Sequence, residues 1–262
     1  MQNRTLKQTL IKNEVYQLYC QAHNVFFENG QDPKKRENYP FLNDEEYQAC
    51  EQLRKAKQQQ RHRIIKWLDY YMLQEDLVII FGTQSFNDDA LERSFDARAK
   101  AVQRMLSQFV DYASNVDYGK ENEREHYHFI AIATQEQVKE VDWQKNKRGR
   151  FYTSCLPMTE PWTKYGWQNW QVINRKDPHV KNKLSGYIAK LVNHSLKVQQ
   201  TKLGYKRNSP YQAFQADLKQ LRFESEKKGG LEQKDYQNAY KWLENRKIME
   251  WLEDPLTYSS PF

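Results

Sequence analysis

The stretch EREHYHFIAIA, Glu123–Ala133, decides the expected fold of this chain. Its second half is apolar and too short for a buried helix, which predicts a β-strand inside a sheet. Because side chains alternate along a strand, His126 and His128 share one face with Ile130 and Ile132. Two imidazoles side by side on a rigid strand can hold one divalent metal ion. An HxH pair on its own is more often two ordinary polar strand residues, so a third ligand is needed to favour a metal site.

A third ligand is expected from the strand that comes just before. NVDYGK, residues 115–120, is separated from the apolar strand by the polar turn ENE, which predicts an antiparallel hairpin. Such a hairpin can place Asp117 opposite the histidines, although one sequence does not fix the register. Glu121 and Glu125 are alternative ligands, with turn and surface roles favoured for both. Two histidines and one carboxylate would leave open positions on a metal ion for substrate oxygens.

Apolar segments on both sides of the hairpin complete a predicted sheet. DLVIIFGTQSF, residues 76–86, is rich in β-branched and aromatic side chains and predicts a central strand, and WQVINR, residues 170–175, predicts another. Between residues 87 and 113, apolar side chains recur at helical steps, which predicts one long helix capped by Asn87 or Asp88. The predicted class is therefore α+β, with helices packed on a central antiparallel sheet.

Both ends of the chain are expected to be helical extensions of this sheet domain. Helices are predicted around residues 6–19, from Asn43 through the basic run 54–66, and late in the chain over 235–253. The basic run is more often a solvated helix face than a binding element. The predicted division is a helical N-terminal extension over 1–72, a sheet domain over 73–200 and a mostly helical C-terminal region over 201–262.

A tyrosine-bearing helix supplies a second group of reactive side chains. Asp177 and the proline after it form a typical helix start, and the helix is predicted to run through LSGYIAKLVNH, residues 184–194. On that helix Tyr187, Lys190 and His194 line one side, so a phenol and an ammonium group are presented together. By itself a YxxK pattern is more often part of a common amphipathic helix.

In chain order, these segments resemble the HUH endonucleases, and among them the single-tyrosine initiators of rolling-circle replication in plasmids and small single-stranded DNA phages. VIIFGTQSF is similar to their first motif, DYGKENEREHYHFIA to their metal motif and GYIAKLVNH to their tyrosine motif. The resemblance implies a palm-like sheet, similar to that of RRM domains, with the metal ligands Asp117, His126 and His128 for Mg²⁺ or Mn²⁺. The acidic position holds Asp, whose reach is one carbon shorter than that of the Glu often found there.

The same resemblance implies cleavage of single-stranded DNA by transesterification. Tyr187 would attack a phosphate, with Lys190 supplying positive charge, and leave a 5′-phosphotyrosyl enzyme and a free 3′-hydroxyl that can be religated or extended. The expected substrate is single-stranded or hairpin origin DNA. The expected partner that extends the 3′-hydroxyl is a host polymerase. A host helicase is also expected as a partner, because no GxxxxGK[ST] signature occurs in the sequence.

Four other functions remain open. A relaxase or a single-strand transposase would share the metal and tyrosine chemistry, although transposases of this type usually carry Gln where this chain has Lys190. A non-catalytic nucleic-acid-binding protein would use only its basic and aromatic residues. A zinc hydrolase using His126 and His128 would keep its activity without Tyr187.

The composition suits a nucleic-acid partner. The 262 residues carry a net charge of +7 and 14% aromatic side chains, a combination that fits phosphates and unpaired bases. Arg148 and Arg150, with Trp167 and Trp170, are the candidates for DNA binding, although core packing is at least as good a prediction for the two tryptophans. Three widely spaced cysteines, the lack of a signal-peptide core and the lack of a long apolar run predict a cytoplasmic protein without disulfides or membrane spans.

Overall fold

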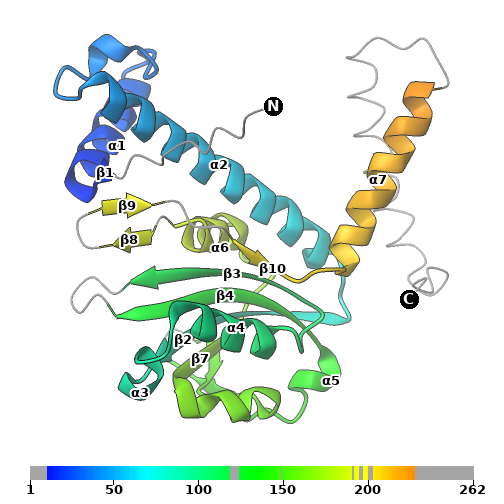
Figure 1. The fold of residues 1–262 in the computed structure, drawn as a ribbon. Helices are drawn as coiled ribbons and strands as arrows, with labels where there is room; N and C mark the ends of the chain where they lie inside the picture. Colours follow the sequence, from blue (N-terminus) through cyan, green and yellow to red (C-terminus); the bar gives the residue numbers. More distant parts are fainter. Residues whose placement is uncertain are drawn as a thin grey trace, which may run out of the picture.

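A computed structural model of the chain describes residues 11–118, 124–147, 149–190, 192–194, 197–199 and 203–227. The fold class is α+β, as predicted, with a seven-stranded antiparallel sheet in the order β10-β3-β4-β2-β7-β6-β5. A second sheet has the order β1-β9-β8. Figure 1 shows the large sheet between two layers of helices, with α2 and α6 on one side and α3 and α4 on the other.

The strands and helices have the following bounds. The large sheet consists of β2 (Leu77–Phe86), β3 (Asp111–Tyr118), β4 (Glu125–Thr134), β5 (Gln144–Lys145), β6 (Phe151–Thr153), β7 (Gly166–Val172) and β10 (Gly204–Tyr205). The small sheet consists of β1 (Ile11–Lys12), β8 (Val192–His194) and β9 (Lys197–Gln199). The helices are α1 (Asn13–Glu28), η1 (Arg36–Asn38), α2 (Asp44–Met72), α3 (Asp88–Leu91), α4 (Phe95–Leu106), α5 (Gln135–Val138), η2 (Pro157–Tyr165), α6 (Val180–Ile188) and α7 (Pro210–Lys227).

Strand β4 lies near the centre of the sheet and separates two hydrophobic clusters. Phe129 and the alanines at 131 and 133 pack into the cluster that contains α4, whereas Ile130 and Ile132 pack into the cluster that contains α2 and α6. This division confirms the predicted alternation of side chains along the strand. Gly82 on β2 lies opposite Phe129, and a Cβ at this position would collide with the phenylalanine ring.

Helix α2 joins the N-terminal region to the sheet. It begins as predicted after Asn43, which exchanges hydrogen bonds with Glu46 in a capping box. At the other end of the helix, the Trp67 indole N–H and the Tyr71 hydroxyl both donate to Oδ2 of Asp111, at 2.8 Å each. Burial raises the pKa of Asp111, which lies at the start of β3. These bonds fix the second half of α2 on the large sheet.

The prediction of one long helix between residues 87 and 113 is wrong. Two short helices form instead, because Asn87 caps α3 through the N–H of Ala90 and Ser94 caps α4 through the N–H of Ala97. The helix ends at Leu106, and the apolar residues after it belong to a turn and to β3. The apolar residues after Leu106 therefore match the helical spacing by coincidence.

The predicted tyrosine helix is also shorter than expected. It begins at Val180 instead of at residue 177, where the Asp177 side chain accepts the N–H of His179, and it ends at Ile188. Lys190 therefore lies just beyond the helix, and His194 belongs to strand β8.

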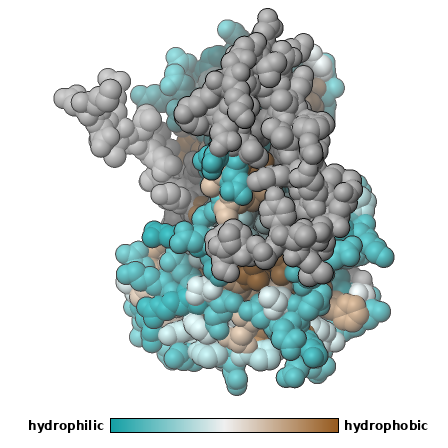
Figure 2. All heavy atoms as spheres, turned by 90° about the vertical axis from the view of Figure 1, so that its right-hand side faces the viewer, coloured by the Kyte–Doolittle hydropathy of each residue, from teal (hydrophilic) through white to brown (hydrophobic). Residues whose placement is uncertain are grey.

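The terminal regions follow the prediction in part. Of the helix predicted around residues 6–19, residues 13–19 lie in α1 and residues 11–12 form β1, whereas residues 6–10 lie outside the described residues. The helix predicted over 235–253 also lies outside them. β10, from the region after residue 200, forms an edge strand of the large sheet. No helix in the described ranges has the length and apolar character needed to cross a membrane. On the side of the molecule in Figure 2, the described surface is mainly hydrophilic, with hydrophobic residues gathered near its middle.

Candidate metal centre beside Tyr187

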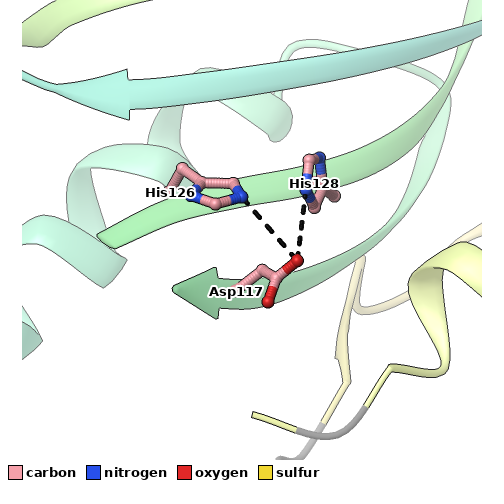
Figure 3. Close-up of side chains that lie close together, drawn as sticks. All are labelled: Asp117, His126 and His128. Carbon is pink, nitrogen blue, oxygen red and sulfur yellow. Dashed lines mark ion pairs between the residues drawn. The ribbon is translucent and has the colours of Figure 1, made fainter. Parts of the chain in front are cut away.

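Three side chains converge at the paired ends of β3 and β4. Asp117 lies directly opposite His126 in the antiparallel register, and His128 is two residues further along the same face. Oδ2 of Asp117 lies 3.7 Å from Nε2 of His126 and 3.5 Å from Nε2 of His128. Figure 3 shows the carboxylate pointing between the two imidazoles. The hairpin register thus unites the three residues predicted as metal ligands.

Hydrogen bonds orient both imidazoles toward the carboxylate. Nδ1 of His126 lies 3.0 Å from the carbonyl oxygen of Arg124, and because a carbonyl can only accept, Nδ1 carries the proton. The lone pair of this ring is then on Nε2, which faces Asp117. Nδ1 of His128 lies 3.0 Å from the hydroxyl of Thr83 on β2. Partners of this kind fix the ring orientation of metal-binding histidines.

The arrangement fits a divalent cation. The three ligand atoms lie within 4.8 Å of one another. Two ligands of one metal ion, each at about 2.1–2.2 Å, are separated by at most about 4.4 Å, so adjustments of a few tenths of an ångström would bring these atoms into range. Two imidazoles and one carboxylate suit Mn²⁺, and also Mg²⁺ where substrate oxygens complete the shell.

The charge states of the site are suited to binding a cation. Burial by itself would raise the pKa of Asp117, but the contacts with His128 and with the Lys190 ammonium outweigh it and hold the pKa well below its usual range. Burial is also the largest influence on His128 and lowers its pKa, in spite of the opposing effect of Asp117. At neutral pH the site therefore presents an ionised carboxylate and a neutral imidazole, the forms that bind metals.

Tyr187 lies against this group of ligands. Its ring centroid is 4.7 Å from that of His128 and 5.3 Å from that of Phe81, in edge-on arrangements. Nζ of Lys190 lies 3.9 Å from the centroid of the tyrosine ring and 3.1 Å from Oδ2 of Asp117. Tyr187 is 41% exposed, so its side chain is accessible to a large substrate.

Asn115 explains how the tyrosine segment is held in place. This buried β3 residue donates from its side-chain amide to the carbonyl oxygens of Ile188, at 2.8 Å, and of Lys190, at 2.9 Å. Ile188 and Ala189 are fully buried beside it. Asn115 was not predicted as a site residue, although it lies two residues before Asp117 and hence on the same face of the strand.

Replacing Asn115 by alanine is expected to loosen this segment. Two carbonyls would lose their donor, which should lower the free energy of unfolding by about 2–3 kcal/mol. Hydrogen exchange at the Ala189 amide, which bonds to the carbonyl of Ser185, should become faster. The measurements are chemical denaturation and hydrogen exchange of the peptide over residues 186–190. Asn182→Ala, on the exposed side of α6, is the matched control, and equal effects of both variants would contradict the assigned role.

The other predicted site residues lie in several places. Trp170 is fully buried, with its indole N–H donating to Gln168, so the prediction that it stacks on DNA bases is wrong. Trp167 is 57% exposed, and Arg150 is exposed. Glu125 is buried and pairs with Arg98, at 2.9 Å from Nε, instead of joining the metal ligands. Arg148, Glu121 and the side chain of His194 lie outside the described residues.

No protein-family model, curated protein or solved structure matches this chain. The chemistry of the site therefore follows from its own residues. A carboxylate and two imidazoles can bind a cation, an exposed phenol can act as a nucleophile, and an ammonium group between them can attract a phosphate.

Proposed function

We propose that this protein cleaves and rejoins single-stranded DNA through a tyrosine nucleophile, as the initiator of rolling-circle replication of a plasmid or phage. The observation that carries the proposal is the contact between the Tyr187 ring and His128, because it joins a nucleophile to a metal-binding group. A divalent cation held by Asp117, His126 and His128 would supply positive charge to a non-bridging oxygen of the scissile phosphate. The resemblance of three sequence segments to the HUH endonucleases points to the same chemistry.

In this reaction the phenol oxygen of Tyr187 forms a bond to phosphorus while the bond from phosphorus to the 3′-oxygen breaks. The phosphate stays on the 5′ end of the downstream strand, and the phenol proton is balanced by the proton that the leaving 3′-oxygen takes up. Lys190 lies beside the tyrosine ring and the carboxylate, so its ammonium group can attract the phosphate and stabilise the phenolate. The reverse step uses the same groups and rejoins the strand.

The position of Tyr187 favours tyrosine chemistry over the alternatives. A zinc hydrolase using the two histidines would need only a water molecule at the metal, and a non-catalytic DNA-binding protein would need neither the histidine tautomer nor the exposed phenol. A relaxase or transposase would use the same groups in the same step. Lys190 disfavours the transposase, because transposases of this type usually carry Gln at that position, whereas a relaxase differs from an initiator in the DNA that it recognises.

The test is covalent capture of DNA. The full chain is incubated with Mn²⁺ and a labelled pool of random-sequence single-stranded DNA, so that every possible recognition sequence is sampled. Denaturing gels then detect protein-bound label. Peptide mapping by mass spectrometry locates the adduct, and sequencing of the trapped DNA identifies the cleaved site. We expect an adduct on Tyr187 that depends on the metal and requires single-stranded substrate.

Three results would count against the proposal. Cleavage without an adduct would favour a metal-dependent hydrolase. An adduct at another residue would move the nucleophile away from Tyr187. Binding of DNA without cleavage, for every metal supplied, would favour a non-catalytic binding protein.

A further inference from the structure

One face of the large sheet changes from apolar to polar along each of its central strands. On β2, Ile79 lies in the cluster covered by α2 and α6, and Phe81 lies at the border of this cluster. Beyond the border, the same face of β2 carries Thr83 and Ser85. On β4 the change occurs between Ile130 and His128. The metal ligands thus lie in the polar half of a face whose apolar half is packed against helices.

The strand register extends this polar half past the metal ligands to the next strand. Ser85 pairs with His126 on one side and with Trp167 of β7 on the other. Thr83 similarly joins His128 to Asn169. Directly paired residues of antiparallel strands point to the same face, so Trp167 and Asn169 share the face of the metal ligands. Neighbouring strands are about 4.8 Å apart, which places Trp167 about 10 Å from His126.

The two tryptophans of β7 differ in their exposure to solvent. Trp170 on the same strand is buried in the core between Phe109 and Phe129, whereas 57% of Trp167 is exposed. Singly exposed large side chains are common, and Phe27 is more exposed at 72%, so what distinguishes Trp167 is its place on the face that carries Asp117, His126 and His128. A flat ring beside polar groups is the arrangement on which unpaired bases stack.

The polar half leads on to a basic edge. The next residue of β7 on this face, Gln171, pairs with Tyr152 of β6, and Tyr152 pairs with Gln144 of β5. The hairpin formed by β5 and β6 carries two exposed cationic residues outside its paired strands, Lys147 in the loop and Arg150 just before β6. Positive charge at the end of this row complements the phosphates of a nucleic-acid strand.

We propose that this polar half is a binding track for unpaired DNA, which runs across β4, β2, β7 and β6 from the metal ligands to the basic hairpin. Trp167 stacks on a base a short distance from the cleaved bond, and the cations of the hairpin bind the backbone beyond it. The proposal rests on the proposed function for the position of the cleaved phosphate. It assigns Trp167 to substrate binding and not to the chemical step.

The test measures binding in the Tyr187→Phe background, without added metal, so that cleavage does not contribute. Fluorescence anisotropy follows a labelled random-sequence single strand, with duplex DNA of the same composition as the comparison. Trp167→Ala should weaken single-strand binding by roughly 5- to 100-fold and leave duplex binding nearly unchanged. Trp167→Tyr should restore most of the affinity, because it returns a stacking ring.

The matched control is Phe151→Ala. Phe151 is also an exposed aromatic residue, 49% exposed, but it precedes Tyr152 on β6 and so points to the opposite face. This variant should bind single strands as the parent does. Arg150→Gln should weaken binding to every sequence and reduce the slope of log affinity against log salt by about one. The fluorescence of 2-aminopurine placed in the strand should be quenched by the parent and less by Trp167→Ala.

The outcomes separate this proposal from the proposed function. If Trp167→Ala weakens binding as expected while the wild-type chain never forms an adduct, the track stands and the cleavage proposal fails. If the chain cleaves DNA while Trp167→Ala binds like its parent, cleavage stands and the track is wrong. An equal loss in the alanine variants of Trp167 and Phe151, or no single-strand binding by the parent, would also overturn the track.

Discussion

Tyr187→Phe is expected to eliminate the covalent adduct and to slow cleavage of single-stranded DNA by on the order of a thousandfold or more. The variant removes only the phenol oxygen, which in the proposed reaction forms the new bond to phosphorus. The measurement is the rate of strand cleavage at saturating Mn²⁺, together with intact mass of the protein after the reaction. The DNA used is the sequence recovered from the capture experiment.

The phenylalanine variant should fold and bind DNA as the wild type does. The contacts of the ring with Phe81, His128 and Lys190 do not use the hydroxyl, and the side chain is 41% exposed. Unchanged thermal stability and unchanged Mn²⁺ affinity would confirm that only the nucleophile is lost. This separates a chemical role of Tyr187 from a role in packing.

A matched control is available elsewhere on the surface. Tyr165 also has cationic side chains over its ring, with Arg93 at 5.0 Å and Lys164 at 5.2 Å, but it lies at the end of η2 and packs against the cluster that contains α4, on the other face of the sheet from the histidines. Tyr165→Phe should cleave at the wild-type rate. Cleavage by Tyr187→Phe at a rate near that of Tyr165→Phe would show that another group attacks the phosphate.

The convergence of Asp117, His126 and His128 could be predicted because the rules behind it are local. Alternation along a strand places His126 and His128 on one face, and few residues separate their strand from the one that carries Asp117. Only the register of the hairpin was left open by the sequence, and in the structure Asp117 pairs directly with His126. The opposite orientations of Trp167 and Trp170 follow from the same rule, since they are three positions apart on one strand.

The end of the tyrosine helix could not be predicted in the same way. The spacing of Tyr187 and Lys190 fits a continuous helix, but the helix ends at Ile188. The carbonyls of Ile188 and Lys190 bond instead to Asn115, which is more than 70 residues away in sequence. A contact over this separation leaves no periodic signal in the sequence. Lys190 still reaches the tyrosine ring, although from beyond the helix and not from its next turn.

His126→Ala is expected to weaken Mn²⁺ binding by at least about 100-fold. Removing a residue that only hydrogen-bonds to a metal ligand usually causes a smaller loss. Of the two histidines, His126 is the safer substitution because its side chain is 19% exposed, against 8% for His128. Isothermal titration with MnCl₂ in the absence of DNA measures the affinity directly, without reference to activity. His62→Ala, on the exposed side of α2, is the control and should bind Mn²⁺ like the wild type.

Thermal unfolding gives an independent measure of the same site. Mn²⁺ at 100 times its dissociation constant should stabilise the wild-type fold by about 2.7 kcal/mol, because the folded state alone assembles the three ligands. The same Mn²⁺ concentration should stabilise His126→Ala much less, and Thr83→Val, which removes the hydroxyl partner of His128, should give an intermediate result. If all three proteins respond to Mn²⁺ equally, the ion binds elsewhere. The carboxylate and imidazoles would then form a polar cluster held by Lys190, and the phosphate would have no metal ion beside Tyr187.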